Sequence, residues 1–115
     1  PGYTYMPTEY LDEKFMEWLL QHEVTKAVIA GKNFGMFDIR FLKKIGFGKI
    51  TNYHHRTIDP GPMFYNPVTD DVPPDLKECL RRTGVEKEIE HTSIADALDV
   101  IKCLRYKYFP LKLGE

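Results

Sequence analysis

Two aspartates and a histidine stand where their side chains could do chemistry together. Asp38 ends a segment that begins with Asn33 and contains Phe37, directly after a short apolar run. His91 lies five residues before Asp96, at the start of a second amphipathic run. Both aspartates are expected in the first turn of a helix. Asp38 enters from a strand end, where ligand sites of α/β proteins usually form.

These residue types suit metal chemistry. Two carboxylates brought together repel each other unless a cation lies between them. Ligands that are all oxygen favour Mg²⁺ or Mn²⁺ over zinc. His91, just outside its helix, can take a proton from water near neutral pH. Carboxylates, a divalent metal and a histidine base together indicate metal-assisted hydrolysis of a phosphodiester.

The first half of the chain predicts two helices and a strand. Residues 9–22 should form a helix capped by Thr8, with Asp12 facing water. Its expected apolar stripe is Leu11, Phe15, Trp18, Leu19 and His22. The apolar run 26–30, which is too short for a helix, predicts a buried strand. A second helix is expected over residues 36–45, with Gly46 as its stop. Its inner side should hold Phe37, Phe41, Leu42 and Ile45.

The second half predicts one more strand and two helices. Residues 53–58 should form a strand, and residues 59–62 a loop. Pro74 suits the first turn of a helix over residues 74–83 that Gly84 closes. The last helix is expected over residues 93–108. Its expected apolar stripe is Ile94, Leu98, Ile101, Leu104 and Tyr108.

This order predicts a single α/β domain over residues 1–115. Two strands joined by a crossover helix favour a parallel pair. A two-stranded sheet has two open edges and too little surface for four helices. We therefore expect further strands before residue 1.

Two segments resemble motifs of the DEDDh-type 3′–5′ exonucleases, which are DnaQ-like members of the ribonuclease-H-like superfamily. Residues 31–42 resemble the second motif, in which an Asn precedes a Phe-Asp pair and a Phe-Leu. His91, followed four residues on by Asp96-Ala97, is similar to the third motif. The resemblance covers residues 9–108.

The resemblance implies a ribonuclease-H-like fold and removal of nucleotides from single-stranded DNA or RNA 3′ ends. Asp38 and Asp96 would be metal ligands, and His91 the general base. Asn33 and Phe37 would shape the substrate site, with Phe37 near the terminal nucleotide. The cofactors would be two Mg²⁺ or Mn²⁺ ions.

The chain departs from this family at the first motif, an Asp-x-Glu on a first strand. The acidic residues before position 24 are all on or beside the first expected helix: Glu9, Asp12, Glu13, Glu17 and Glu23. Two of four carboxylates are therefore missing. We expect a fold without its first strands, and an inactive chain when it is tested by itself.

Each of these residues also has a structural interpretation. Asp38 can favour the helix dipole, and Asp96 can form a weak capping box with Ser93. His91 can be an ordinary loop histidine. Asp59 fits a turn, since Pro60 and Gly61 follow it. His54 and His55 point to opposite faces of a strand, so they cannot chelate one ion.

Two further hypotheses therefore stay open beside the enzyme. The chain can be a non-catalytic module derived from a nuclease, with a structural or nucleic-acid-docking role. It can also be an unrelated α/β domain in which both motifs are coincidental. The basic residues Lys32, Arg40, Lys43 and Lys44 could line a nucleic-acid path, although a solvated helix face explains them as well.

The amino-acid composition narrows the classes of protein to which the chain can belong. A formal charge of -1 from 16 basic and 17 acidic residues excludes a strongly basic nucleic-acid binder. Cys79 and Cys103 lie at helical spacing among apolar residues, which favours buried thiols. No apolar run reaches the ~18 residues of a membrane span, and we expect a cytosolic protein.

Overall fold

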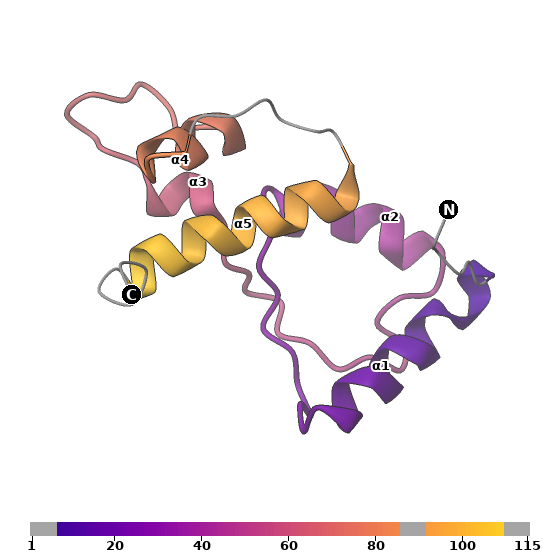
Figure 1. The fold of residues 1–115 in the computed structure, drawn as a ribbon. Helices are drawn as coiled ribbons and strands as arrows, with labels where there is room; N and C mark the ends of the chain where they lie inside the picture. Colours follow the sequence, from indigo (N-terminus) through magenta and orange to yellow (C-terminus); the bar gives the residue numbers. More distant parts are fainter. Residues whose placement is uncertain (1–6, 86–91, 110–115) are drawn as a thin grey trace. The chain divides into compact units, whose positions relative to one another are not determined.

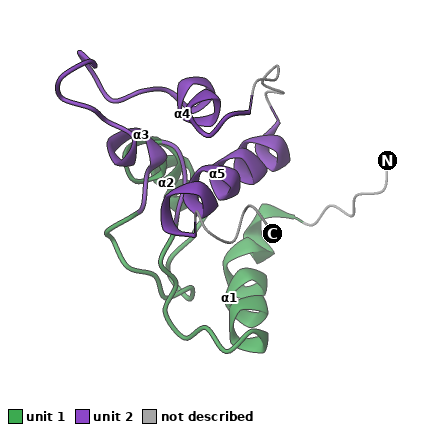
Figure 2. Ribbon diagram, turned by 60° about the vertical axis from the view of Figure 1, so that its left-hand side comes forward, with its two compact units in different colours: residues 1–29, 33–57 green, residues 30–32, 58–115 purple. Residues whose placement is uncertain are grey.

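The computed structural model describes residues 7–85 and 92–109, which form helical elements joined by turns (Figure 1). The elements are η1 (Thr8–Tyr10), α1 (Leu11–Gln21), η2 (Phe34–Asp38), α2 (Ile39–Lys44), α3 (Pro60–Met63), α4 (Leu76–Arg82) and α5 (Ser93–Tyr108). The chain divides into two compact units (Figure 2): unit 1 is residues 1–29 and 33–57, and unit 2 is residues 30–32 and 58–115.

The predicted α/β, ribonuclease-H-like fold is wrong for the described residues, which contain no sheet. The two expected strands reduce to isolated parallel bridges, Ala27 with Tyr53 in unit 1 and Ala30 with Ile58 in unit 2. The two bridges differ in register, because three residues separate Ala27 from Ala30 whereas five separate Tyr53 from Ile58, so they do not extend into one ladder. A lone pair of extended segments leaves N–H and C=O groups open along both outer edges, so a ladder gains little.

Unit 1 is built on α1, which confirms the expected helix but not its buried face. The buried positions are Asp12, Met16 and Leu19, one helical stripe that packs on Ala27. Trp18, which was expected inside, is 51% exposed. The prediction that Asp12 faces water is wrong, because its carboxylate binds backbone N–H groups of the segment 48–51.

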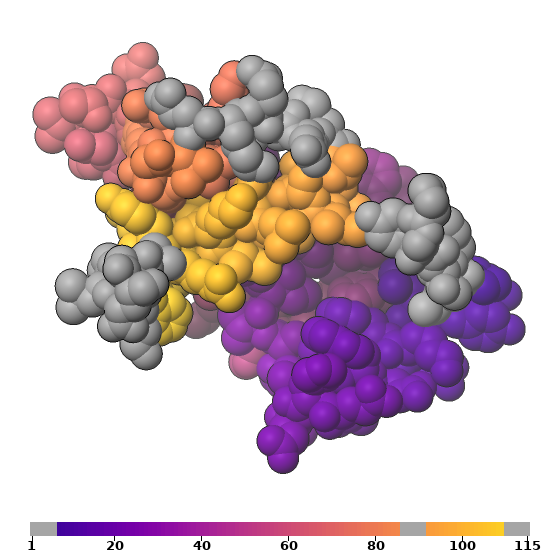
Figure 3. Space-filling view, viewed as in Figure 1, coloured from indigo at the N-terminus to yellow at the C-terminus, as the bar shows by residue number. Residues whose placement is uncertain are grey.

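Unit 2 packs α3, α4 and α5 around Phe64, Cys79, Leu80 and Cys103. The bounds of α5 match the prediction, but the expected apolar stripe does not face the core. The buried side is Ala95, Asp99, Val100 and Cys103. The expected stripe includes exposed Ile94, Leu98, Ile101 and Tyr108, and much of α5 is open on the face shown in Figure 3.

Local capping explains two more differences. Residues 60–63, expected in a loop, form the short helix α3. The Asp59 carboxylate accepts a hydrogen bond from the Gly61 N–H, and Pro60 fits the first turn. The helix α4 is capped by Asp75 and not started by Pro74. Gly84, at φ 93°, follows α4 as expected.

Candidate functional site

The segment that carries Asn33 and Asp38 has an unusual backbone in unit 1. Asn33 is left-handed, at φ 59°. The next residues, Phe34–Asp38, form a π-helical turn that passes directly into α2. Single π turns and left-handed non-glycine residues both occur preferentially at functional sites. The motif found in the sequence therefore coincides with a local backbone feature of that kind.

Asp38 stands at the start of α2 with an exposed side chain. Its carboxylate makes no capping hydrogen bond, and it forms no ion pair with any residue that the structure describes. The oxygens of Asp38 are therefore available to a ligand.

Phe37 and Phe41 project outward instead of forming the inner side of a helix. They are 60% and 55% exposed, and their rings meet edge-on with centroids 5.1 Å apart. The prediction that both rings face inward is wrong. A π turn holds more residues than an α turn, so it shifts the following side chains around the helix axis. The exposed Phe37 ring is free to stack on an aromatic ligand.

Asp96 lies in the first turn of α5 in unit 2, and its side chain is half-buried. The helix is capped by Thr92, whose Oγ1 accepts a hydrogen bond of 3.2 Å from the Ala95 N–H. The interpretation of Asp96 as part of a capping box with Ser93 is therefore wrong. Within residues 7–85 and 92–109, no hydrogen bond or ion pair engages the Asp96 carboxylate. His91 lies outside the described residues.

Asp59 has a structural role in unit 2. Its Oδ1 accepts a hydrogen bond of 2.9 Å from the Gly61 N–H and lies 3.9 Å from the Lys32 Nζ. These contacts fix the start of α3, so Asp59 caps a helix where the sequence predicted a turn.

The donor chemistry of Asp38 and Asp96 fits Mg²⁺ or Mn²⁺ in type but not in number. Both offer uncommitted carboxylate oxygens, which these ions prefer, yet an octahedral ion takes six ligands. Across the described part of the chain, no three His, Cys, Asp or Glu side chains gather as a metal centre. Asp38 belongs to unit 1 and Asp96 to unit 2.

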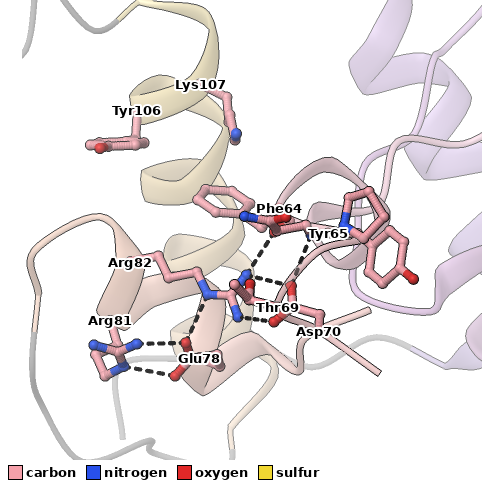
Figure 4. Close-up of a pocket in the computed structure, with 11 residues that line it drawn as sticks. Phe64, Tyr65, Thr69, Asp70, Glu78, Arg81, Arg82, Tyr106 and Lys107 are labelled. Carbon is pink, nitrogen blue, oxygen red and sulfur yellow. Dashed lines mark hydrogen bonds and ion pairs between the residues drawn. The ribbon is translucent and has the colours of Figure 1, made fainter. Parts of the chain in front are cut away.

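A pocket in unit 2 was not predicted from the sequence. It is an open cavity of about 770 Å³ between the segment after α3, the helix α4 and the last turn of α5 (Figure 4). Its lining is Phe64, Tyr65, Asn66, Pro67, Thr69, Asp70, Glu78, Arg81, Arg82, Tyr106 and Lys107. These residues come from three separate stretches of the sequence. The only local signal is the spacing of Glu78, Arg81 and Arg82, which places three charged side chains on one face of a helix.

One side of this pocket is a fixed ionic network. Arg82 pairs with Asp70 at 2.6 and 2.8 Å, with Glu78 at 2.7 Å, and with the Phe64 carbonyl oxygen at 2.7 Å. Arg81 holds both oxygens of Glu78 at 2.7 Å. Hydrogen bonds from Arg82 and from the Asn66 N–H lower the pKa of Asp70 to about 2. Hydrogen bonds from Arg81 and Arg82 lower the pKa of Glu78 to about 2 as well, so both carboxylates are ionised at neutral pH.

Comparisons with known proteins yield no relative. No family model, no curated protein and no solved structure matches the chain. Among the helices that the structure describes, none has the length and apolar character needed to cross a bilayer.

Proposed function

We propose that this chain contributes to a metal-dependent 3′–5′ exonuclease that hydrolyses phosphodiester bonds at single-stranded DNA or RNA 3′ ends. One observation carries the proposal. The two motif aspartates, Asp38 and Asp96, are each held at a helix start with no hydrogen-bonding or ionic partner in the described residues. A capping role would have engaged the carboxylate of either residue in a hydrogen bond to a backbone N–H group.

Each residue then has a defined role. Asp38 and Asp96 would hold the metal ion, which when bound would supply activation of water and stabilisation of charge on the phosphate. His91 accepts the proton that the water loses. Phe37 stacks on the terminal base through its exposed ring, and Asn33 holds the turn that presents Phe37 and Asp38.

Two carboxylates bind Mg²⁺ weakly, so we expect the 115-residue chain to show no 3′ trimming by itself. A binding measurement therefore tests the proposal better than an activity assay does. Fluorescence anisotropy would measure the affinity for a labelled single-stranded oligonucleotide with a free 3′ hydroxyl, with Mn²⁺ and with EDTA. We expect Mn²⁺ to tighten binding, and D38N or D96N to abolish that gain. Asp71→Asn, which changes an exposed aspartate outside both motifs, is the matched control.

The alternative is a docking module without catalysis. It predicts oligonucleotide binding that is equal in Mn²⁺ and EDTA and unchanged by D38N and D96N. That result would refute the metal-dependent proposal. Mg²⁺-dependent 3′ trimming by the 115-residue chain, lost in D96A, would instead refute the expectation of inactivity.

A further inference from the structure

The unit 2 pocket combines aromatic rings with an excess of positive charge. Three cations, Arg81, Arg82 and Lys107, face two carboxylates, Asp70 and Glu78. Because both carboxylates are committed to the arginines, the pocket disfavours a cationic ligand. It suits a ligand that carries negative charge.

Lys107 supplies the positive charge that is open to such a ligand. Its Nζ lies 4.7 Å from the centroid of the Phe64 ring, and it forms no ion pair with the residues described in the structure. The ring contact orients the ammonium group without neutralising it. Lys107 is therefore placed to pair with a phosphate.

Tyr106 and Tyr65 supply flat aromatic surface in the lining of the same pocket. Their side chains are 40% and 39% exposed. Tyr106 stacks on Phe64, with centroids 6.2 Å apart and planes 25° apart. Phe64 is buried, and its carbonyl oxygen accepts a hydrogen bond from Arg82 in the ionic network. These contacts hold the Phe64 ring, on which Tyr106 stacks, in place. Figure 4 shows Tyr106 and Lys107 on the last turn of α5, with their side chains on different sides of the helix.

We propose that this pocket binds one nucleotide of a single-stranded nucleic acid, with the base on Tyr106 and a phosphate on Lys107. Such a combination of stacking and cationic contacts is typical of single-strand binding sites. The inference rests on the proposed function, because it places a second contact for the same strand. Tyr106 lies ten residues after Asp96 on one helix, which is about 15 Å at 1.5 Å per residue.

That separation predicts a dependence on strand length. A stacked strand advances ~3.4 Å per nucleotide, so about four or five nucleotides span the distance between Asp96 and the pocket. Affinity for fluorescein-labelled oligo(dT) or oligo(rU) should rise between about three and six nucleotides and then level off.

Substitutions in the pocket separate the two contacts. Tyr106→Ala should weaken binding of a ten-nucleotide strand about fivefold or more and leave a dinucleotide unaffected, while Tyr106→Phe keeps the affinity. Lys107→Ala should reduce the slope of log K against log salt by about 0.7, the loss of one phosphate contact, while Lys107→Arg keeps the slope. Tyr108→Ala, on the same helix but outside the pocket lining, is the control.

The inference is overturned if Tyr106→Ala and Lys107→Ala, shown to be folded by circular dichroism, bind every strand length as the unchanged protein does. A second result would also overturn the inference. In that result, an acidic peptide that contains tyrosine binds in a way that depends on Tyr106 and Lys107, and oligonucleotides do not bind. The two proposals fail differently. Loss of Mn²⁺ dependence concerns Asp38 and Asp96, whereas loss of the length-dependent gain concerns the pocket.

Discussion

At the scale of single residues, Asp12 shows how a polar side chain can organise a core. The sequence places it among water-facing acids, yet it is 6% exposed. Its carboxylate accepts hydrogen bonds from Gly48, Ile50 and Thr51 N–H groups at 3.0, 2.7 and 2.9 Å. Burial opposes its ionisation, but hydrogen bonds from Thr51, Gly48 and Ile50 outweigh this and lower its pKa to about 2.

The low pKa predicts a pH-dependent contribution to stability. A folded pKa below the ordinary value of 3.8 means that Asp12 stabilises the fold fully above about pH 4. The contribution is lost as pH falls through about 2. Asp12→Asn should lower the free energy of unfolding at pH 7 by about 2 kcal/mol. Urea denaturation from pH 7 to pH 2 would measure this, with the exposed neighbour Glu13→Gln as control. A difference that persists unchanged at pH 2 would contradict the assignment.

The two cysteines should be unreactive. Both thiols are buried, and burial raises the pKa of each to about 11. At pH 8 roughly one thiol in a thousand is then ionised, and only the thiolate reacts. Cys79 and Cys103 should therefore resist a disulfide reagent in the native protein and react at once in 6 M guanidinium. Rapid labelling of the native protein would show that unit 2 opens easily.

At the scale of elements, the turn before α2 depends on a residue that tolerates positive φ. Asn33, at φ 59°, is one of the few non-glycine types that does so readily. Asn33→Gly should keep the stability nearly unchanged, and Asn33→Ala should cost about 1 kcal/mol. Thermal unfolding of both variants would test this. Equal losses in both would instead assign the role to the Asn33 side chain.

Helix bounds were more predictable than helix faces. The bounds of α5 were found from the sequence, although its cap is Thr92 and not Ser93, and Gly84 correctly marked the close of α4. The buried face of α5 could not. Apolar residues lie on both sides of the helix, and the side that packs holds small residues such as Ala95 and Cys103. Which side is covered depends on neighbours that periodicity does not specify.

At the scale of the whole molecule, the prediction of a β-sheet was the main error. The pattern of helix and apolar run predicted strands, and it did place two parallel bridges. It did not determine whether those segments form a ladder, because that depends on a constant register between them, which the pattern does not specify. The positions of Asp38 and Asp96 at helix starts were found from the motifs, whereas the pocket around Arg82 depends on contacts between distant stretches.

The proposed function requires that Asp38 and Asp96 bind the same divalent cation. The most direct measurement is nuclear magnetic resonance of the ¹⁵N-labelled protein with substoichiometric Mn²⁺, which broadens amide signals near the bound ion. We predict selective broadening at residues 33–40 and 92–99 together, with both regions restored in D96N and in D38N. Broadening of one region only, or of both in a way that either substitution leaves unchanged, would contradict the claim.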